Sequence, residues 1–174
     1  VGVDINPVAW LITKAKTVPI EPKKLRKEIN KILSDISAFI EFRRKKIKPL
    51  KEIDIEPVIP DNERIKYWFP HSHIREELGI ILGRINKIRE EDIRNFCLCA
   101  FSQSLKNCSV WLMKSVKPTR DLKKRPADPF QAFKKHINYM MRGNEELFKL
   151  MPEHVKRNLD KYLIAERGDA RDLP

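Results

Sequence analysis

Apolar residues recur along most of this chain at steps of three and four, the spacing of one face of a helix. The most regular stretch covers residues 23–46, where Lys, Arg and Glu separate the apolar positions. A second long helix is predicted after Ser72, whose hydroxyl can cap its N-terminus. A third is predicted to begin at Glu91 or Asp92 and to reach Met113, and its wide apolar arc is typical of a central, mostly buried helix.

Prolines divide the remaining helical pattern. A fourth long helix is predicted to begin at Asp128 or Pro129 and to end at Pro152. A short helix is predicted over residues 8–17, after an Asn-Pro turn. The proline-containing segment 49–60 is expected to lie extended against the helices.

Two short apolar runs near the ends of the sequence have the length of strands. The first occupies residues 1–5 and leads into a turn. The second occupies residues 161–165 and leads into Glu-Arg-Gly-Asp. The chain is therefore predicted to be mainly α, with two short strands that lie far apart in the sequence.

The net charge of the chain predicts the class of its binding partner. The chain has 36 Lys+Arg against 24 Asp+Glu, a formal net charge of +12, and such an excess attracts polyanions. Nucleic acid is the leading class of partner. A lysine-rich solvated surface, as in many thermophile proteins, is the alternative explanation.

Basic residues concentrate in segment 114–125, which contains proline and has no hydrophobic period. Its side chains suit phosphate oxygens, a kind of contact that positions DNA without reading its sequence. The alternative is a solvated, disordered run of charge. The predicted DNA-binding residues are Lys114, Lys117, Arg120, Lys123, Lys124 and Arg125.

The remaining candidate residues indicate no metal and no membrane. Cys97, Cys99 and Cys108 lie in one apolar stretch and form no zinc pattern, so buried free thiols in a reducing cytoplasm are expected. His71 and His73 do not share a helix face. No apolar run approaches the roughly 18 residues that a membrane span needs.

Two aspartates stand where the predicted strands end. Ligands of open α/β sheets bind outside the carboxyl ends of the strands. There, the carboxylate of Asp4 can accept hydrogen bonds from ribose hydroxyls, and that of Asp169 can accept one from an adenine amine. Each alone is explained equally by a helix cap or a turn.

Together, the two ends resemble a known family. Val-Gly-Val-Asp-Ile-Asn-Pro at residues 1–7, with the ten residues that follow, is similar to the second-strand region of S-adenosylmethionine-dependent DNA methyltransferases. Gly-Asp-Ala-Arg-Asp-Leu-Pro at residues 168–174 resembles the third-strand motif of the same enzymes. The similarity is to the subgroup that methylates the amino group of adenine-N6 or cytosine-N4.

The resemblance implies a division of the chain. Residues 1–20 and 161–174 would be strand remnants of a Rossmann-like (class I) methyltransferase sheet, and residues 21–160 a basic helical insertion. It implies S-adenosylmethionine as the cofactor of the intact parent protein. The implied cofactor-binding residues are Asp4, Asn6, Asp169 and Ala170.

The family's glycine-rich loop and its Ser/Asp-Pro-Pro-Tyr tetrapeptide match no position in this sequence, so no catalytic residue is assigned. The sequence has no initiating Met and stops directly after a motif, which we interpret as an internal piece of a longer, site-specific DNA methyltransferase in a restriction-modification setting. Alone, the chain is expected to be inactive, and its partners are DNA and the rest of the polypeptide. The alternative is a non-catalytic basic helical domain that binds nucleic acid or another protein.

Overall fold

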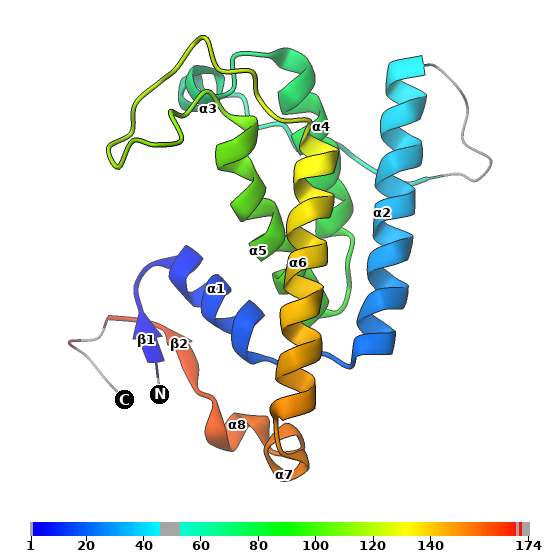
Figure 1. The fold of residues 1–174 in the computed structure, drawn as a ribbon, viewed down its shortest axis with the longest axis vertical. Coiled ribbons are helices and arrows are strands. Elements are labelled where there is room, and N and C mark those ends of the chain that lie inside the picture. Colours follow the sequence, from blue (N-terminus) through cyan, green and yellow to red (C-terminus); the bar gives the residue numbers. More distant parts are fainter. Residues whose placement is uncertain (1, 46–52, 170, 172–174) are drawn as a thin grey trace.

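Four long helices form the body of the protein in the computed structural model, which describes residues 2–45, 53–169 and 171 (Figure 1). They pack against one another, with α5 and α6 in the most extensive contact. Their amphipathic patterns predicted them. They are α2 (Pro22–Lys45), α4 (Ser72–Asn86), α5 (Glu91–Cys108) and α6 (Pro129–Leu150).

One hydrophobic core joins these helices. Its members are the residues that the three- and four-residue spacing placed on the inner faces, since burial of one apolar stripe drives helix association. Phe133 and Ile81 are fully buried, as is the Cys97 thiol of α5. Cys99 and Cys108 are also buried, as expected.

Residues 53–60 of the predicted linker 49–60 have no helical structure and lie against α4, as predicted, and residues 49–52 lie outside the described residues. Its Ile55 side chain is buried, and the N–H of Val58 donates to the carbonyl of Gly79 at 3.0 Å. A Cβ at Gly83 would overlap the carbonyl oxygen of Glu56. Glycine is needed at that position because the linker backbone crosses the helix there.

A single guanidinium connects three helices of the body. Arg44 of α2 donates from Nε to Oε1 of Glu77 on α4 at 2.7 Å, and from Nη2 to Oδ2 of Asp128 before α6 at 2.7 Å. Burial raises the pKa of Glu77, against the effect of the Arg44 hydrogen bond. Burial also works to raise the pKa of Asp128, but hydrogen bonds from Arg44 and the N–H of Gln131 outweigh it and lower that pKa.

The two ends of the sequence meet in a small parallel sheet. Strand β1 (Gly2–Asp4) pairs with β2 (Ala165–Arg167), in the register Gly2 to Ala165 and Asp4 to Arg167. The two terminal runs predicted as strands are thus neighbours that pair in parallel. Helix α1 (Pro7–Thr17) follows β1, and the short helices α7 (Glu153–Lys156) and α8 (Leu159–Tyr162) lead from α6 back to β2.

Several predicted boundaries are wrong. The second strand was expected at residues 161–165, but the backbone is helical through Tyr162 and the strand begins at Ala165. The third long helix was expected to reach Met113, but it ends at Cys108. Ser109 has an extended backbone there, and its hydroxyl accepts from the N–H of Trp111 instead of continuing the helical ladder.

Two helix starts also differ from expectation. Helix α4 begins at Ser72 itself, with His71 at the N-cap and no side-chain cap. The short helix α3 (Glu63–Trp68) was not predicted. Its N-terminus is capped by Asn62, whose Oδ1 accepts from the N–H of Ile65 at 2.9 Å. In the part of the chain that the structure describes, no helix is long and apolar enough to cross a bilayer.

Candidate functional site

Both predicted cofactor carboxylates lie at the carboxyl edge of the strand pair. Asp4 ends β1, and the N–H of Gly168 donates to its carbonyl at 3.3 Å, so the turn that carries Asp169 lies beside Asp4. The sheet is held to α1 by Trp10, whose indole N–H donates to the carbonyl of Ala165 at 3.0 Å. The strand pairing thus brings together residues that are remote in sequence.

The side chains of the β1–α1 turn are bonded within the turn. Asp4 Oδ1 accepts from the N–H of Asn6 at 2.8 Å, and Asn6 Oδ1 accepts from the N–H of Val8 at 2.9 Å. Asn6 therefore caps α1, the local role expected of this residue type. The Asp4 carboxylate is exposed, and its Oδ2 accepts no hydrogen bond from any residue that the structure describes.

Asp169 already has a cationic partner that the sequence analysis did not identify. Arg171 donates from Nε to both carboxylate oxygens of Asp169, at 3.0 and 3.1 Å. The side-chain and backbone hydrogen bonds from Arg171 lower the pKa of Asp169. Ala170, the other residue predicted at the adenine, lies outside the described residues.

An open groove of about 620 Å³ lies beside β2. It is bounded by α1 at Trp10, by α5 at Asn95 and Leu98, and by β2. Asn95 is buried although it is polar. Because Arg167, the last residue of β2, also lines the groove, the groove lies next to the candidate cofactor edge.

The basic segment 114–125 belongs to a folded hairpin, and the alternative of a disordered charge run is wrong for it. Trp111 and Arg120 form an antiparallel bridge, and the N–H of Leu112 donates to the carbonyl of Thr119 at 2.9 Å. The N–H of Asp121 donates to the carbonyl of Val110 at 2.7 Å. We call residues 111–125 the basic hairpin.

Two of its six predicted DNA-binding residues help to fold the hairpin. The guanidinium of Arg120 lies 4.0 Å from the centroid of the Tyr67 ring. Lys124 Nζ donates to the carbonyls of Lys106 and Trp111 at 2.9 and 3.0 Å, and burial lowers its pKa. Both side chains are partly buried.

The other four cations of the hairpin point to solvent. They are exposed, and they form no ion pair with any residue in the described ranges. These side chains are the ones available to a phosphate backbone. They are Lys114, Lys117, Lys123 and Arg125.

Aromatic rings anchor the hairpin to the body. Trp68 stacks on Trp111 with ring centroids 5.1 Å apart, and Tyr67 meets Trp68 edge to face, also at 5.1 Å. Lys106 Nζ lies 5.1 Å from the centroid of the Trp111 ring. Trp68 and Trp111 each have one ring face covered by the other ring. This arrangement favours anchoring of the hairpin over base stacking as the role of these rings.

The basic hairpin and the strand pair project from the same side of the body but from opposite ends (Figure 1). The groove beside the strands includes Asn95, near the start of α5, whereas the hairpin follows Cys108 at the end of that helix. The helical rise separates these two positions by about 20 Å. The basic hairpin therefore begins at the opposite end of α5 from the groove beside β2.

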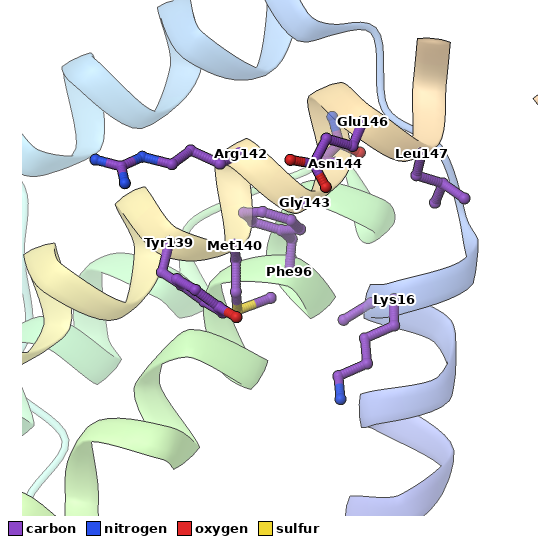
Figure 2. A pocket seen from close by; sticks show the side chains of 10 residues that line it. Lys16, Phe96, Tyr139, Met140, Arg142, Gly143, Asn144, Glu146 and Leu147 are labelled. Carbon is purple, nitrogen blue, oxygen red and sulfur yellow. The ribbon is translucent and has the colours of Figure 1, made fainter. Parts of the chain in front are cut away.

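A second pocket, of about 470 Å³, lies between α1, α5 and α6. Figure 2 shows Tyr139 and Met140 of α6 facing a space that Lys16 of α1 borders from the other side. The amide of Asn144 is engaged with the backbone of Ile20 through hydrogen bonds of 2.9 and 2.7 Å. The sequence analysis did not indicate this pocket.

Comparison with known proteins relates the chain to one curated enzyme. A stretch of 111 residues is 33% identical to the type II methyltransferase M.MvaI of Kocuria varians. This chain is related to a DNA methyltransferase. The match covers 62% of the chain and 22% of that enzyme, so the chain spans about a fifth of the length of this curated relative. No family model and no solved structure matches the chain.

A relation to a DNA methyltransferase implies a methyl donor and a DNA substrate for the related enzyme. It does not distinguish transfer to an amino group from transfer to a ring carbon.

Proposed function

We propose that this chain is part of a DNA methyltransferase that transfers a methyl group to an exocyclic amine of adenine or cytosine. In this proposal residues 1–20 and 161–174 belong to a Rossmann-like core, and residues 21–160 form a helical insertion that faces DNA. The observation that carries the proposal is the parallel pairing of β1 with β2, because it brings Asp4 and Asp169 to one sheet edge. The relation to a type II enzyme supports it.

The strand edge is better suited to the ribose of S-adenosylmethionine than to its adenine. Asp4 is exposed and has an oxygen available for ribose hydroxyls, with Asn6 holding the turn below it. Asp169 would accept a hydrogen bond from the adenine amine only after Arg171 releases one of its oxygens. S-adenosylmethionine, when bound, supplies the methyl group, and residues of this chain hold its adenosine end.

Activity of the complete reading frame tests this assignment. Transfer of labelled methyl groups from S-adenosylmethionine to duplex DNA is expected, and Asp4→Ala should raise the KM for S-adenosylmethionine by about 10-fold or more, since a charged hydrogen-bond acceptor is worth about 1.5–3 kcal/mol. Asp160→Ala, which removes an exposed carboxylate of α8 away from the groove, is the matched control. A KM unchanged by Asp4→Ala would contradict the ribose assignment.

The methylated base is identified by nuclease digestion and chromatography of the product DNA. N6-methyladenine or N4-methylcytosine supports the amino subgroup, and 5-methylcytosine contradicts it. If the complete reading frame transfers no methyl group but binds DNA, the alternative of a non-catalytic nucleic-acid-binding domain is correct. The net charge of +12 is compatible with that alternative.

The DNA-facing role of the basic hairpin is tested by binding of the 174-residue chain to duplex DNA at increasing salt. Four phosphate contacts predict a slope of log K against log salt concentration of about −3.6. Lys123→Ala with Arg125→Ala should reduce the slope by about 1.8, since each contact contributes about 0.9. Lys27→Ala with Lys31→Ala, on the exposed face of α2, is the control pair, and an equal reduction by both pairs would remove the hairpin from the interface.

A further inference from the structure

Apolar side chains gather at the exposed end of the basic hairpin. Val116 is 98% exposed, more than any other large apolar residue that the structure describes. Met113 and Leu112, which lie on the same side of the Trp111–Arg120 bridge as Val116, are also exposed. Single exposed apolar residues are common on protein surfaces, but a group of them at the end of one loop marks a contact surface.

The tip that carries Val116 is held in shape by its own hydrogen bonds. The N–H of Ser115 donates to the carbonyl of Leu112 at 3.1 Å, and its hydroxyl donates to the carbonyl of Lys117 at 2.7 Å. The hydroxyl of Thr119 also donates to the carbonyl of Lys117, at 3.1 Å. A preformed tip loses little conformational entropy when it inserts into a partner.

The charges around the tip identify the partner. Lys114 and Lys117 flank Val116, while Lys123 and Arg125 lie on the returning arm, and all four are exposed. Duplex DNA offers the matching pair of surfaces, because phosphates line both sides of each groove and the apolar faces of the stacked bases are exposed when a base step opens. Proteins that bend DNA use an apolar side chain in this way, inserted between two base pairs from the minor groove.

We propose that the tip of the basic hairpin is a wedge: Val116 enters the base stack of duplex DNA while Lys114 and Lys117 bind the flanking phosphates. This inference rests on the proposed DNA-facing role of the hairpin. The hairpin begins about 20 Å along α5 from the groove beside the strands, a distance of about six base pairs at 3.4 Å each. The wedge therefore kinks the duplex at a distance from the cofactor edge and does not extrude the base that lies there.

Ring closure of short DNA measures this bending without knowledge of the recognised sequence. Fragments of about 150 base pairs, near the persistence length, close slowly under ligase unless a bound protein bends them. We expect the 174-residue chain to accelerate closure by about 10-fold or more, and Val116→Ser to lose most of that acceleration while its salt slope stays the same. Val116→Ile should retain the acceleration, because it keeps the apolar wedge.

Leu150→Ser is the matched control, because Leu150 is 80% exposed on α6, away from the hairpin, and its replacement should leave ring closure unchanged. If the chain binds DNA without accelerating closure, or if Val116→Ser accelerates it equally, the wedge is wrong and the DNA-facing role stands. If the chain does not bind DNA at all, both are wrong. Val116-dependent binding to vesicles of anionic phospholipid without binding to DNA would assign the tip to a membrane surface and overturn the proposal.

Discussion

The helical body and the strand pair are stabilised in different ways. The hydrophobic core of the body extends from Ile20 to Met141 and contains no residue of β1 or β2. In the strand pair only Ala165 is buried, and the sheet is held by backbone hydrogen bonds and by the indole of Trp10. Two strands of three residues are at most marginally stable in isolation.

The difference indicates which part of the molecule depends on its surroundings. The body buries its apolar faces within itself, so its fold is determined by the helices that form its core. The strand pair buries little, and its geometry depends on α1 and on whatever else packs beside it. The candidate cofactor edge therefore belongs to the weaker region, whereas the candidate DNA surface is anchored by the stack of Trp111 on Trp68.

The largest effect should come from the body's core. Phe133→Ala should lower the free energy of unfolding by about 3–5 kcal/mol, because it removes a fully buried ring and leaves a cavity. Urea unfolding followed by circular dichroism measures this change. Tyr139→Ala, at an exposed position of the same helix, should change stability by about 0.5 kcal/mol or less, and similar losses for both variants would contradict a core centred on Phe133.

The contact between the linker and α4 should show the next largest effect. Gly83→Ala should cost about 1–3 kcal/mol, because its Cβ would overlap the carbonyl oxygen of Glu56. Gly143→Ala on α6 should instead stabilise the protein by about 0.5–1 kcal/mol, since no atom lies within 4 Å of its Cβ. Thermal unfolding of both variants tests the opposite signs, and equal signs would contradict the close crossing at Gly83.

The buried thiol of α5 predicts how the body responds to pH. Burial raises the pKa of Cys97 from 9.0 to about 12. The thiol ionises near pH 9 when the chain is unfolded and stays protonated in the fold, so its contribution to stability is complete below pH 9 and is lost as the pH rises toward 12. The loss is about 1.4 kcal/mol per pH unit.

Urea unfolding of the wild type and of Cys97→Ala at several pH values above 9 measures this contribution. The variant should show the smaller decrease in stability with pH. If both lose stability at the same rate, Cys97 is not shielded from water in the way that its position in the core implies.

The smallest effect is expected in the strand pair. Trp10→Phe removes the indole N–H that bonds the carbonyl of Ala165, and should weaken the local pairing by about 0.5–1.5 kcal/mol. Amide hydrogen exchange should become faster at Gly2 and Gly168, whose N–H groups close the sheet. The global unfolding free energy of the body should stay nearly constant, and an equal drop in both quantities would show that the two regions unfold as one unit.

The sequence predicted the long helices because each buries a continuous apolar stripe. It did not predict α3, α7 and α8, which contain at most six residues and are too short to show a helical period. It also extended α5 too far, because Leu112 and Met113 continue the apolar spacing although both are exposed in the basic hairpin. The spacing of apolar residues in the sequence shows which positions could be buried. It does not show which of them are buried in the fold.

The candidate site was predicted in outline. The positions of Asp4 and Asp169 near the ends of two strands followed from the apolar runs that precede them, and the parallel pairing of those strands is what the structure adds. The role of Lys124 could not be predicted, because its acceptors are carbonyls whose position depends on where α5 ends. One feature of the sequence could have indicated the ion-pair partner of Asp169, namely an arginine two positions later, at Arg171.

The bridge made by Arg44 has a consequence for folding kinetics. Its partners Glu77 and Asp128 are 33 and 84 residues away in sequence, so both ion pairs require long chain segments to close first. We expect such contacts to form late in folding, after the helices that pack locally. Replacing Arg44 with Met should therefore accelerate unfolding and leave the folding rate nearly unchanged. The Arg44 guanidinium would then slow the unfolding of the helical body without contributing to its formation.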